Sequence, residues 1–170
     1  MSTPDAPVDQ LTGADLHEVA PPPPSSTKSA HAGSRTATRA AVGWGVVVGV
    51  ATAATPVGFW WLPATTVYAV GLAFIAAVYL GFAVADGRRR VIAVEVAVLS
   101  AFVLIAAVAI TGSPWLIVTG LAGHGFKDLW QHRTQFVRGT RWWPPFCFAV
   151  DMAVAGIVAS QLLLGANFHS

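Results

Sequence analysis

Long apolar segments follow one another along most of the chain, and short polar connections separate them. A polar, proline-rich stretch, residues 1–39, precedes the first of these segments. A helix needs roughly 20 apolar residues to cross the hydrocarbon core of a bilayer, and each segment has about that length. The pattern therefore predicts an all-α fold, a polytopic transmembrane helix bundle of about five spans. The predicted spans are residues 40–62, 65–85, 91–111, 114–135 and 145–166.

Prolines mark the ends of these segments. Pro63, Pro114 and Pro144 stand at segment boundaries, where the missing amide proton costs least. Pro56 lies inside the first segment, so we expect it to kink that helix or to end it early. Residues 1–39 are rich in Pro, Ser, Thr and Ala and cannot bury enough apolar area to offset the entropy of ordering. They are predicted to form a disordered cytoplasmic tail.

Basic residues occur beside every second connection and are absent from the others. Cytoplasmic connections carry the excess of Lys and Arg in membrane proteins, so the N-terminus is predicted to be cytoplasmic in a bacterial-type inner membrane. The formal charge of +2 is explained by this topology and does not indicate a nucleic-acid partner. The basic groups are Lys28, Arg35 and Arg39, then Arg88, Arg89 and Arg90, and finally Arg133, Arg138 and Arg141.

Composition strengthens the membrane prediction. Hydrophobic residues make up 55% of the chain and charged residues only 11%, whereas soluble domains carry about 25% charged residues. Small residues also recur every four positions, as at Gly45 and Gly49 in the first span and at Ala93 and Ala97 in the third. Such faces let helix backbones approach closely. They predict packing within the bundle and leave open a homo-oligomer or a partner subunit in a membrane complex.

Four acidic residues lie within or at the edge of the predicted spans: Asp86, Glu95, Asp128 and Asp151. An ionisable group inside a span costs at least about 2.5 kcal/mol on insertion scales, so each one marks a candidate site. At a rise of 1.5 Å per residue, Glu95 lies about 6 Å and Asp151 about 10 Å from the cytoplasmic ends of their helices. We therefore expect the ionisable groups to gather in the cytoplasmic half of the bundle.

The fourth segment carries the central motif. His124, Asp128 and His132 are spaced four residues apart and share one helix face. The two histidines are about 12 Å apart along the axis, so one ion would take one of them with Asp128 and recruit a carboxylate from a neighbouring helix. Nitrogen and carboxylate ligands suit zinc, iron or manganese. The candidate metal ligands are His124, Asp128, His132, Asp151 and Glu95, and the candidate catalytic residues are His124, Asp128, His132 and Asp151.

The same region resembles a group of small bacterial multi-span membrane proteins. The resemblance rests on His124-Gly125-x-x-Asp128-x-x-x-His132, followed by Arg141-Trp142-Trp143-Pro144-Pro145-Phe146-Cys147-x-x-x-Asp151. That group has no established activity, so the resemblance implies that these residues form one unit and implies no reaction. Cys147 is the single cysteine and excludes an internal disulfide. It is a candidate ligand or nucleophile, or a small apolar filler.

Three functions remain open from the sequence. The first is an enzyme that acts on a lipid or isoprenoid substrate through a metal or a His–Asp acid/base pair; it predicts a pocket beside His124 and Asp151. The second is a scaffold or accessory subunit whose polar cluster fixes helix register, which predicts that every polar group is paired. The third is proton-coupled transport, which predicts a polar path to the outer surface.

Overall fold

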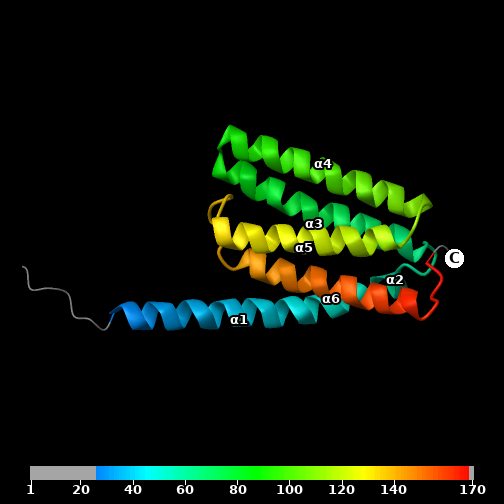
Figure 1. Cartoon of the computed structure of the whole chain (residues 1–170), viewed down its shortest axis with the longest axis horizontal. Coiled ribbons are helices and arrows are strands. Elements are labelled where there is room, and N and C mark those ends of the chain that lie inside the picture. The colour runs from blue at the N-terminus through cyan, green and yellow to red at the C-terminus, as the bar shows by residue number, and fades with distance from the viewer. Residues whose placement is uncertain (1–25, 169–170) are drawn as a thin grey trace, which may run out of the picture.

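The structure is a computed structural model, and it describes residues 26–168, with side chains described from Arg35 onward. Residues 1–25 of the predicted tail lie outside this range. Every regular element within it is a helix, as the sequence predicts, and the long helices run side by side (Figure 1). The elements are α1 (Ser26–Ala53), α2 (Thr55–Gly58), α3 (Ala64–Asp86), α4 (Arg89–Thr111), α5 (Trp115–Thr134) and α6 (Trp143–Leu163).

Four helical segments of the described chain are long and apolar enough to cross a membrane: Arg35–Gly58, Ala64–Asp86, Arg89–Thr111 and Trp143–Leu163. α5 is less apolar because its second half carries the polar motif. It nevertheless lies inside the bundle, where it contacts α3, α4 and α6 (Figure 1). The predicted helix bundle is thus confirmed, and its least apolar helix is also its central one.

The first helix differs most from its predicted bounds. α1 begins at Ser26, before the predicted start of the first span at residue 40. Six of residues 26–39 are Ala, Lys or Arg, which have high helix propensity, and no proline interrupts them, so the helix of the first span can extend backwards. Pro56 ends the helix early, as expected: α1 stops at Ala53, and the proline stands in the first turn of the short helix α2.

The helices pack in two layers that α5 joins. α1 packs along α6, α3 packs along α4, and α5 lies between these pairs. Two glycines of α1 face α6: a Cβ atom on Gly45 would overlap the carbonyl oxygen of Phe146, and one on Gly49 would lie 2.8 Å from the Cβ of Ala153. The small-residue face of α1 is therefore used within the chain. The corresponding alanines of α4, such as Ala93, are exposed.

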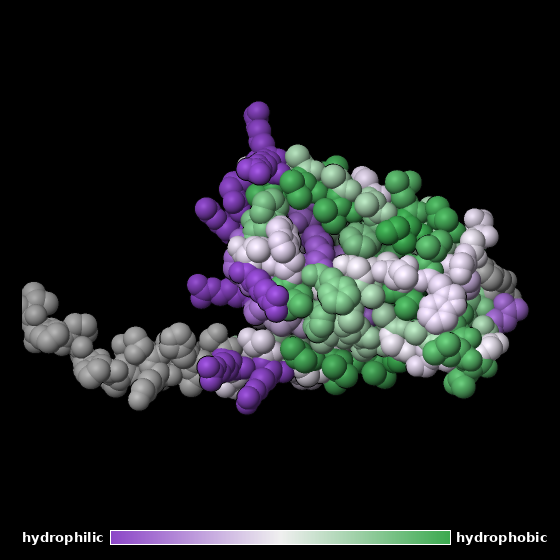
Figure 2. All heavy atoms as spheres, viewed as in Figure 1, coloured by the Kyte–Doolittle hydropathy of each residue, from purple (hydrophilic) through white to green (hydrophobic). Residues whose placement is uncertain are grey.

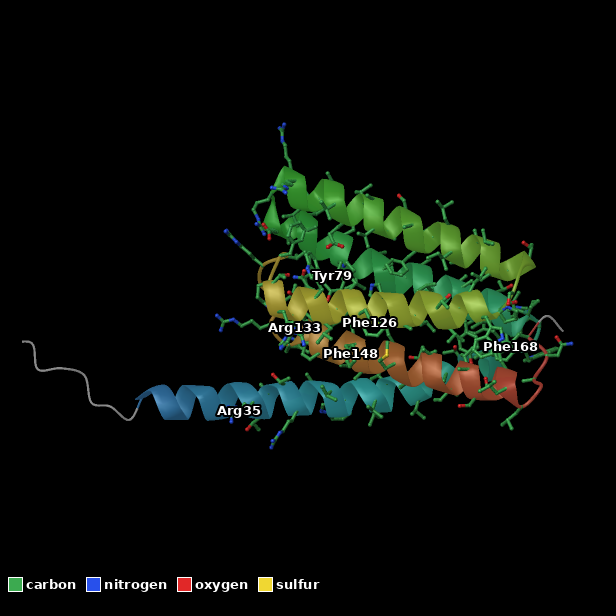
Figure 3. The ribbon with its side chains drawn as sticks, in the orientation of Figure 1. Arg35, Tyr79, Phe126, Arg133, Phe148 and Phe168 are labelled. Carbon is green, nitrogen blue, oxygen red and sulfur yellow. The ribbon has the colours of Figure 1, made fainter. Side chains whose placement is uncertain are left out.

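One end of the bundle is basic. Hydrophilic side chains gather at the end where α1, the α3–α4 connection and the α5–α6 connection meet the surface (Figure 2). Figure 3 places Arg35 and Arg133 towards this end and Phe168 at the opposite one. The described arginines of this basic end are Arg35, Arg39, Arg88, Arg89, Arg90, Arg133, Arg138 and Arg141.

Asp86 has a structural role at this basic end. Its carboxylate accepts hydrogen bonds from the Arg88 guanidinium, at 2.7 Å from Nη2, and from the backbone N–H of Arg138, at 2.9 Å. Arg88 Nη2 also donates to the carbonyl oxygen of Phe136. The neighbouring carboxylate raises the pKa of Arg88 above its usual value. Asp86 thus ties the α3–α4 connection to the α5–α6 connection and lies apart from the other intramembrane acids.

Candidate metal centre

His124, Asp128 and Asp151 form a compact group between α5 and α6. All three side chains are fully buried. His124 Nδ1 lies 2.7 Å from Asp151 Oδ2 and 3.6 Å from Asp128 Oδ2. One ligand atom from each residue lies within 4.8 Å of the other two. The three residues can therefore reach a single cation, and we call them the His–Asp group.

The close approach of α5 and α6 depends on a glycine. A Cβ atom on Gly125 would lie 2.6 Å from Met152 Cε and 3.4 Å from the Cβ of Asp151. The missing side chain therefore lets the backbone of α5 come close to Asp151. Because His124 precedes this glycine directly in the chain, its ring meets the Asp151 carboxylate across the interface.

Aromatic rings enclose the histidine on its other sides. The His124 ring packs edge-on against Phe102, with centroids 5.1 Å apart, and lies 6.0 Å from the Tyr79 ring. These contacts limit the rotation of the imidazole ring. In the described part of the chain, His124 Nε2 and Asp151 Oδ1 have no hydrogen-bond partner. The group thus holds buried polar atoms that its neighbours leave unsatisfied.

Glu95 belongs to a separate ion pair. Its carboxylate is 1% exposed and lies 2.8 Å from Lys127 Nζ. The ammonium group also lies over the Tyr79 ring, 3.5 Å from the centroid, in a cation–π contact. Lys127 therefore neutralises Glu95 rather than Asp151, and the structure does not bring Glu95 into the His–Asp group.

The charges of the buried residues do not balance. Glu95 and Lys127 cancel each other, whereas the His–Asp group holds two carboxylates beside one imidazole. With a neutral His124, two negative charges would remain in a region of low dielectric constant, where an unpaired charge is strongly unfavourable. Either one divalent cation or two protons would neutralise the group. The first solution would be a metal centre, and the second a hydrogen-bonded acid/base pair.

The remaining candidates lie nearby without joining the group. His132 is half-buried, two turns beyond His124 towards the basic end, and lies outside the His–Asp group. Cys147 is a buried free thiol one turn before Asp151 on α6.

Sequence reasoning missed Tyr79, although it is one of only two tyrosines in the chain and lies in an apolar span. That scarcity was the available signal.

A second missed residue is Gln131, which is fully buried. Its amide donates to the carbonyl oxygen of Val137 at 2.8 Å and to Thr140 Oγ1 at 3.4 Å. These bonds hold the α5–α6 connection against the end of α5. Gln131 directly precedes His132 in α5, and nothing in the sequence pattern indicates that Gln131 is the more buried of the two.

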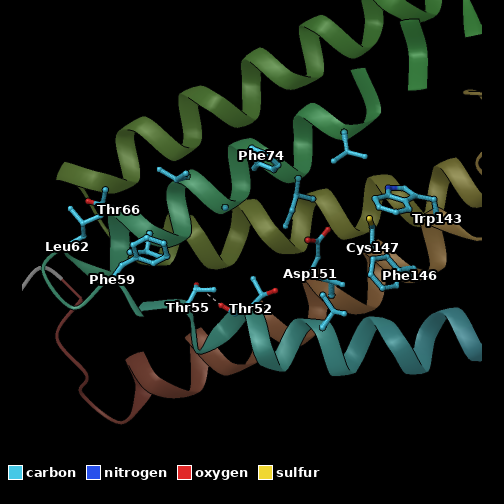
Figure 4. Close-up of a pocket in the computed structure, with 17 residues that line it drawn as sticks. Thr52, Thr55, Phe59, Leu62, Thr66, Phe74, Trp143, Phe146, Cys147 and Asp151 are labelled. Carbon is cyan, nitrogen blue, oxygen red and sulfur yellow. Dashed lines mark hydrogen bonds between the residues drawn. The ribbon is translucent and has the colours of Figure 1, made fainter. Parts of the chain in front are cut away.

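An apolar cleft reaches the His–Asp group from the side. It lies between α1 and α3, with α6 as its inner wall, and has a volume of about 430 Å³ (Figure 4). Asp151 and Cys147 line its wall, while His124 and Asp128 are not among its lining residues. The other lining residues are mainly aliphatic and aromatic: Val48, Thr52, Thr55, Phe59, Leu62, Thr66, Val67, Val70, Gly71, Phe74, Ile75, Val78, Trp143, Phe146 and Val150.

Comparison with known proteins adds no identity to this geometry. No protein-family model, no curated protein and no solved structure matches the chain. The function therefore has to be argued from the His–Asp group and the cleft alone.

Proposed function

We propose that this chain is an integral membrane enzyme whose His–Asp group binds one divalent transition metal and acts on a lipid-like substrate. The observation that carries the proposal is the group itself: three ligand atoms within 4.8 Å of one another, on fully buried side chains. Two carboxylates beside a neutral imidazole carry two negative charges, which one divalent cation would neutralise. This donor set suits zinc, iron or manganese.

Each residue has a distinct role in this proposal. His124 and Asp128 are ligands from the same face of α5, and Asp151 is the ligand from α6 that also borders the cleft. Phe102 and Tyr79 hold the imidazole in place. A bound metal would polarise an oxygen of the substrate or activate a water molecule. The ligand set is compatible with both hydrolysis and oxidation.

The basic end of the bundle gives the orientation of the site. We assign this end to the cytoplasm because Lys and Arg gather on that side of membrane proteins, and a bacterial-type inner membrane is the compartment that fits. Asp151 follows the start of α6 at Trp143, so it would lie about 12 Å from the basic end at 1.5 Å per residue. The site would then serve substrates of the cytoplasmic leaflet.

A metal-free acid/base site is the second candidate. It is favoured by the 2.7 Å contact between His124 Nδ1 and Asp151 Oδ2, which would orient the imidazole as a general base. A scaffold should have every buried polar group paired. His124 Nε2 has no hydrogen-bond partner among the described residues, which argues against that alternative. Proton transport expects a polar path, whereas the cleft is lined mainly by apolar side chains.

Metal analysis of the intact chain tests the proposal. The protein is purified in mild detergent without a histidine tag, and its zinc, iron and manganese contents are measured. We expect close to one metal ion per chain in the native protein and a loss of the ion in both His124→Ala and Asp128→Asn. His132→Ala is the matched control, because it removes the same side chain from the same helix outside the His–Asp group, and it should keep the metal.

Two results would overturn the proposal. One is a well-folded, freshly prepared native protein without metal, which would favour the metal-free pair. The other is a loss of metal in His132→Ala equal to that in His124→Ala, which would place the ion elsewhere on α5.

A further inference from the structure

The cleft between α1 and α3 opens towards the membrane. α1 and α3 are joined near one end, where the Tyr68 hydroxyl donates to the carbonyl oxygen of Ala53 at 2.6 Å. Over the rest of the cleft they stand apart above α6 (Figure 4). Val70 and Phe74, on its α3 side, are 60% and 76% exposed. Because both helices are apolar enough to span a bilayer, this opening faces lipid rather than water.

The lining of the cleft excludes most polar ligands. Its threonines lie towards the end near α2, where Thr55 Oγ1 already donates to the carbonyl oxygen of Thr52 at 2.7 Å. Apart from these threonines, Gly71, Cys147 and Asp151, the lining is aliphatic and aromatic. A sugar, nucleotide or peptide lying there would lose its hydrogen bonds to water without replacement, at about 1–3 kcal/mol for each group. The cleft accordingly favours a long apolar chain.

Asp151 places a carboxylate part-way along the cleft, between the threonines near α2 and Trp143 (Figure 4). Its side chain is fully buried, lines the wall, and has an Oδ1 atom without a hydrogen-bond partner among the described residues. The thiol of Cys147 lies one turn away on the same wall. From Thr66 to Val78 the α3 side extends about 18 Å at 1.5 Å per residue. A chain lying in the part of the cleft between the α2 end and Asp151 would bring its polar group beside the Asp151 carboxylate.

We propose that the cleft binds the hydrocarbon chain of a membrane lipid, with the polar end of the lipid placed at Asp151. Its volume of about 430 Å³ falls in the range of small-molecule sites, about 300–1,000 Å³. The surrounding bilayer supplies long apolar chains at high concentration and offers little else that matches the lining. This inference rests on the proposed function for the fate of the lipid, since the metal centre would act on the group held at Asp151.

The glycines of α3 provide a test that leaves the His–Asp group untouched. Gly71 lines the cleft, and a Cβ atom added there meets nothing within 4 Å, so Gly71→Leu would fill the cleft. Gly81→Leu is the matched control: it is the same change on the same helix, also into open space, but outside the cleft. Both variants gain helix propensity equally, so a difference between them reports on the cleft.

The measurement is photochemical labelling of the full chain in phospholipid vesicles. The probe is a phosphatidylethanolamine with a diazirine on one palmitoyl chain, and labelled residues are identified by peptide mass spectrometry. We expect labels on the cleft residues of α3 and α6 in the native chain. Gly71→Leu should lower cleft labelling at least about tenfold, which corresponds to about 1.4 kcal/mol of lost affinity. Gly81→Leu should change it less than about twofold, and both variants should keep the native metal content.

The inference is overturned if Gly71→Leu labels as strongly as the native chain. It is also overturned if the cleft labels no more than the exposed α4 residues Val103 and Leu104, because the probe would then report only the bilayer around the bundle. The proposed function fails separately: cleft labelling in a protein without metal supports the lipid site and removes the metal centre. Bound metal without cleft labelling supports the metal centre and overturns the lipid site.

Discussion

The contact between α1 and α6 leads to a prediction about Gly45. α1 forms one wall of the cleft and is held in place mainly by α6. A methyl group on Gly45 would overlap the carbonyl oxygen of Phe146 and lie 2.7 Å from the Cβ of Ala149. Neither atom belongs to a flexible side-chain end, so the overlap can be relieved only by moving the helices apart. Overpacking of this kind costs about 1–3 kcal/mol.

Gly43→Ala is the reference for this change. Gly43 lies two residues earlier on the same helix, and a Cβ atom there meets nothing within 4 Å. Replacing glycine by alanine inside a helix stabilises it by roughly 0.5–1 kcal/mol, and this gain applies to both variants. We therefore expect Gly45→Ala to be about 1–3 kcal/mol less stable than Gly43→Ala, whatever the helix propensity contributes.

The assay is reversible unfolding in mixed detergent micelles at increasing mole fractions of a denaturing detergent. The chain has seven tryptophans, so fluorescence follows the transition without a label. Lipid labelling in the cleft should fall together with stability in Gly45→Ala, because the α1 wall moves. Equal stability of the two variants would refute the close packing of α1 on α6, and with it the position of one cleft wall.

Two further changes test the buried polar contacts by the same unfolding assay. Lys127→Met leaves Glu95 buried without its partner and should destabilise the fold by about 3–5 kcal/mol; adding Glu95→Gln should recover most of that loss, and a double variant as unstable as the single one would contradict the pairing. Gln131→Ala removes one of the two donors to the buried Val137 carbonyl, which Thr140 Oγ1 also bonds, and should cost about 0.5–1.5 kcal/mol. Gln161→Ala, on the exposed side of α6, should keep a free energy of unfolding within about 0.5 kcal/mol of the native chain. An equal loss of stability in the two variants would show that the buried hydrogen bond of Gln131 is not the cause of its effect.

The sequence predicted the helices well because membrane spans obey strong local rules. Length, apolar composition and proline position are all readable along the chain, and the end of α1 before Pro56 followed directly from them. The start of α1 at Ser26 did not, because helix propensity can extend a helix into a stretch that has few apolar residues. Composition alone cannot separate a polar helix from a polar coil.

The arrangement of the acids could be predicted only in part. Helix periodicity places His124 and Asp128 on one face, and depth along α6 brings Asp151 to a similar level. Which basic group meets which acid depends on how each helix is rotated about its own axis, and that is set by packing. In the structure Lys127 pairs with Glu95 on α4, a choice that helix spacing along α5 does not determine.

The cleft had no sequence signal at all. It exists because α1 packs on α6 and α3 packs on α4, which leaves a space between the two pairs. Each pairing follows from small or apolar faces, but the gap between them is a property of the whole bundle. Gly71 contributes to the gap by lacking a side chain, and nothing in its local sequence sets it apart from Gly81.

The polar half of α5 also has a consequence for how the protein is made. α5 is absent from the segments that are apolar enough to span a membrane on their own, and its charged groups find their partners on helices both before and after it: Glu95 on α4 and Asp151 on α6. We therefore expect α5 to become stable in the bilayer during synthesis only when α6 has emerged and packs against it, because a helix with ionisable groups gains little from the lipid on its own.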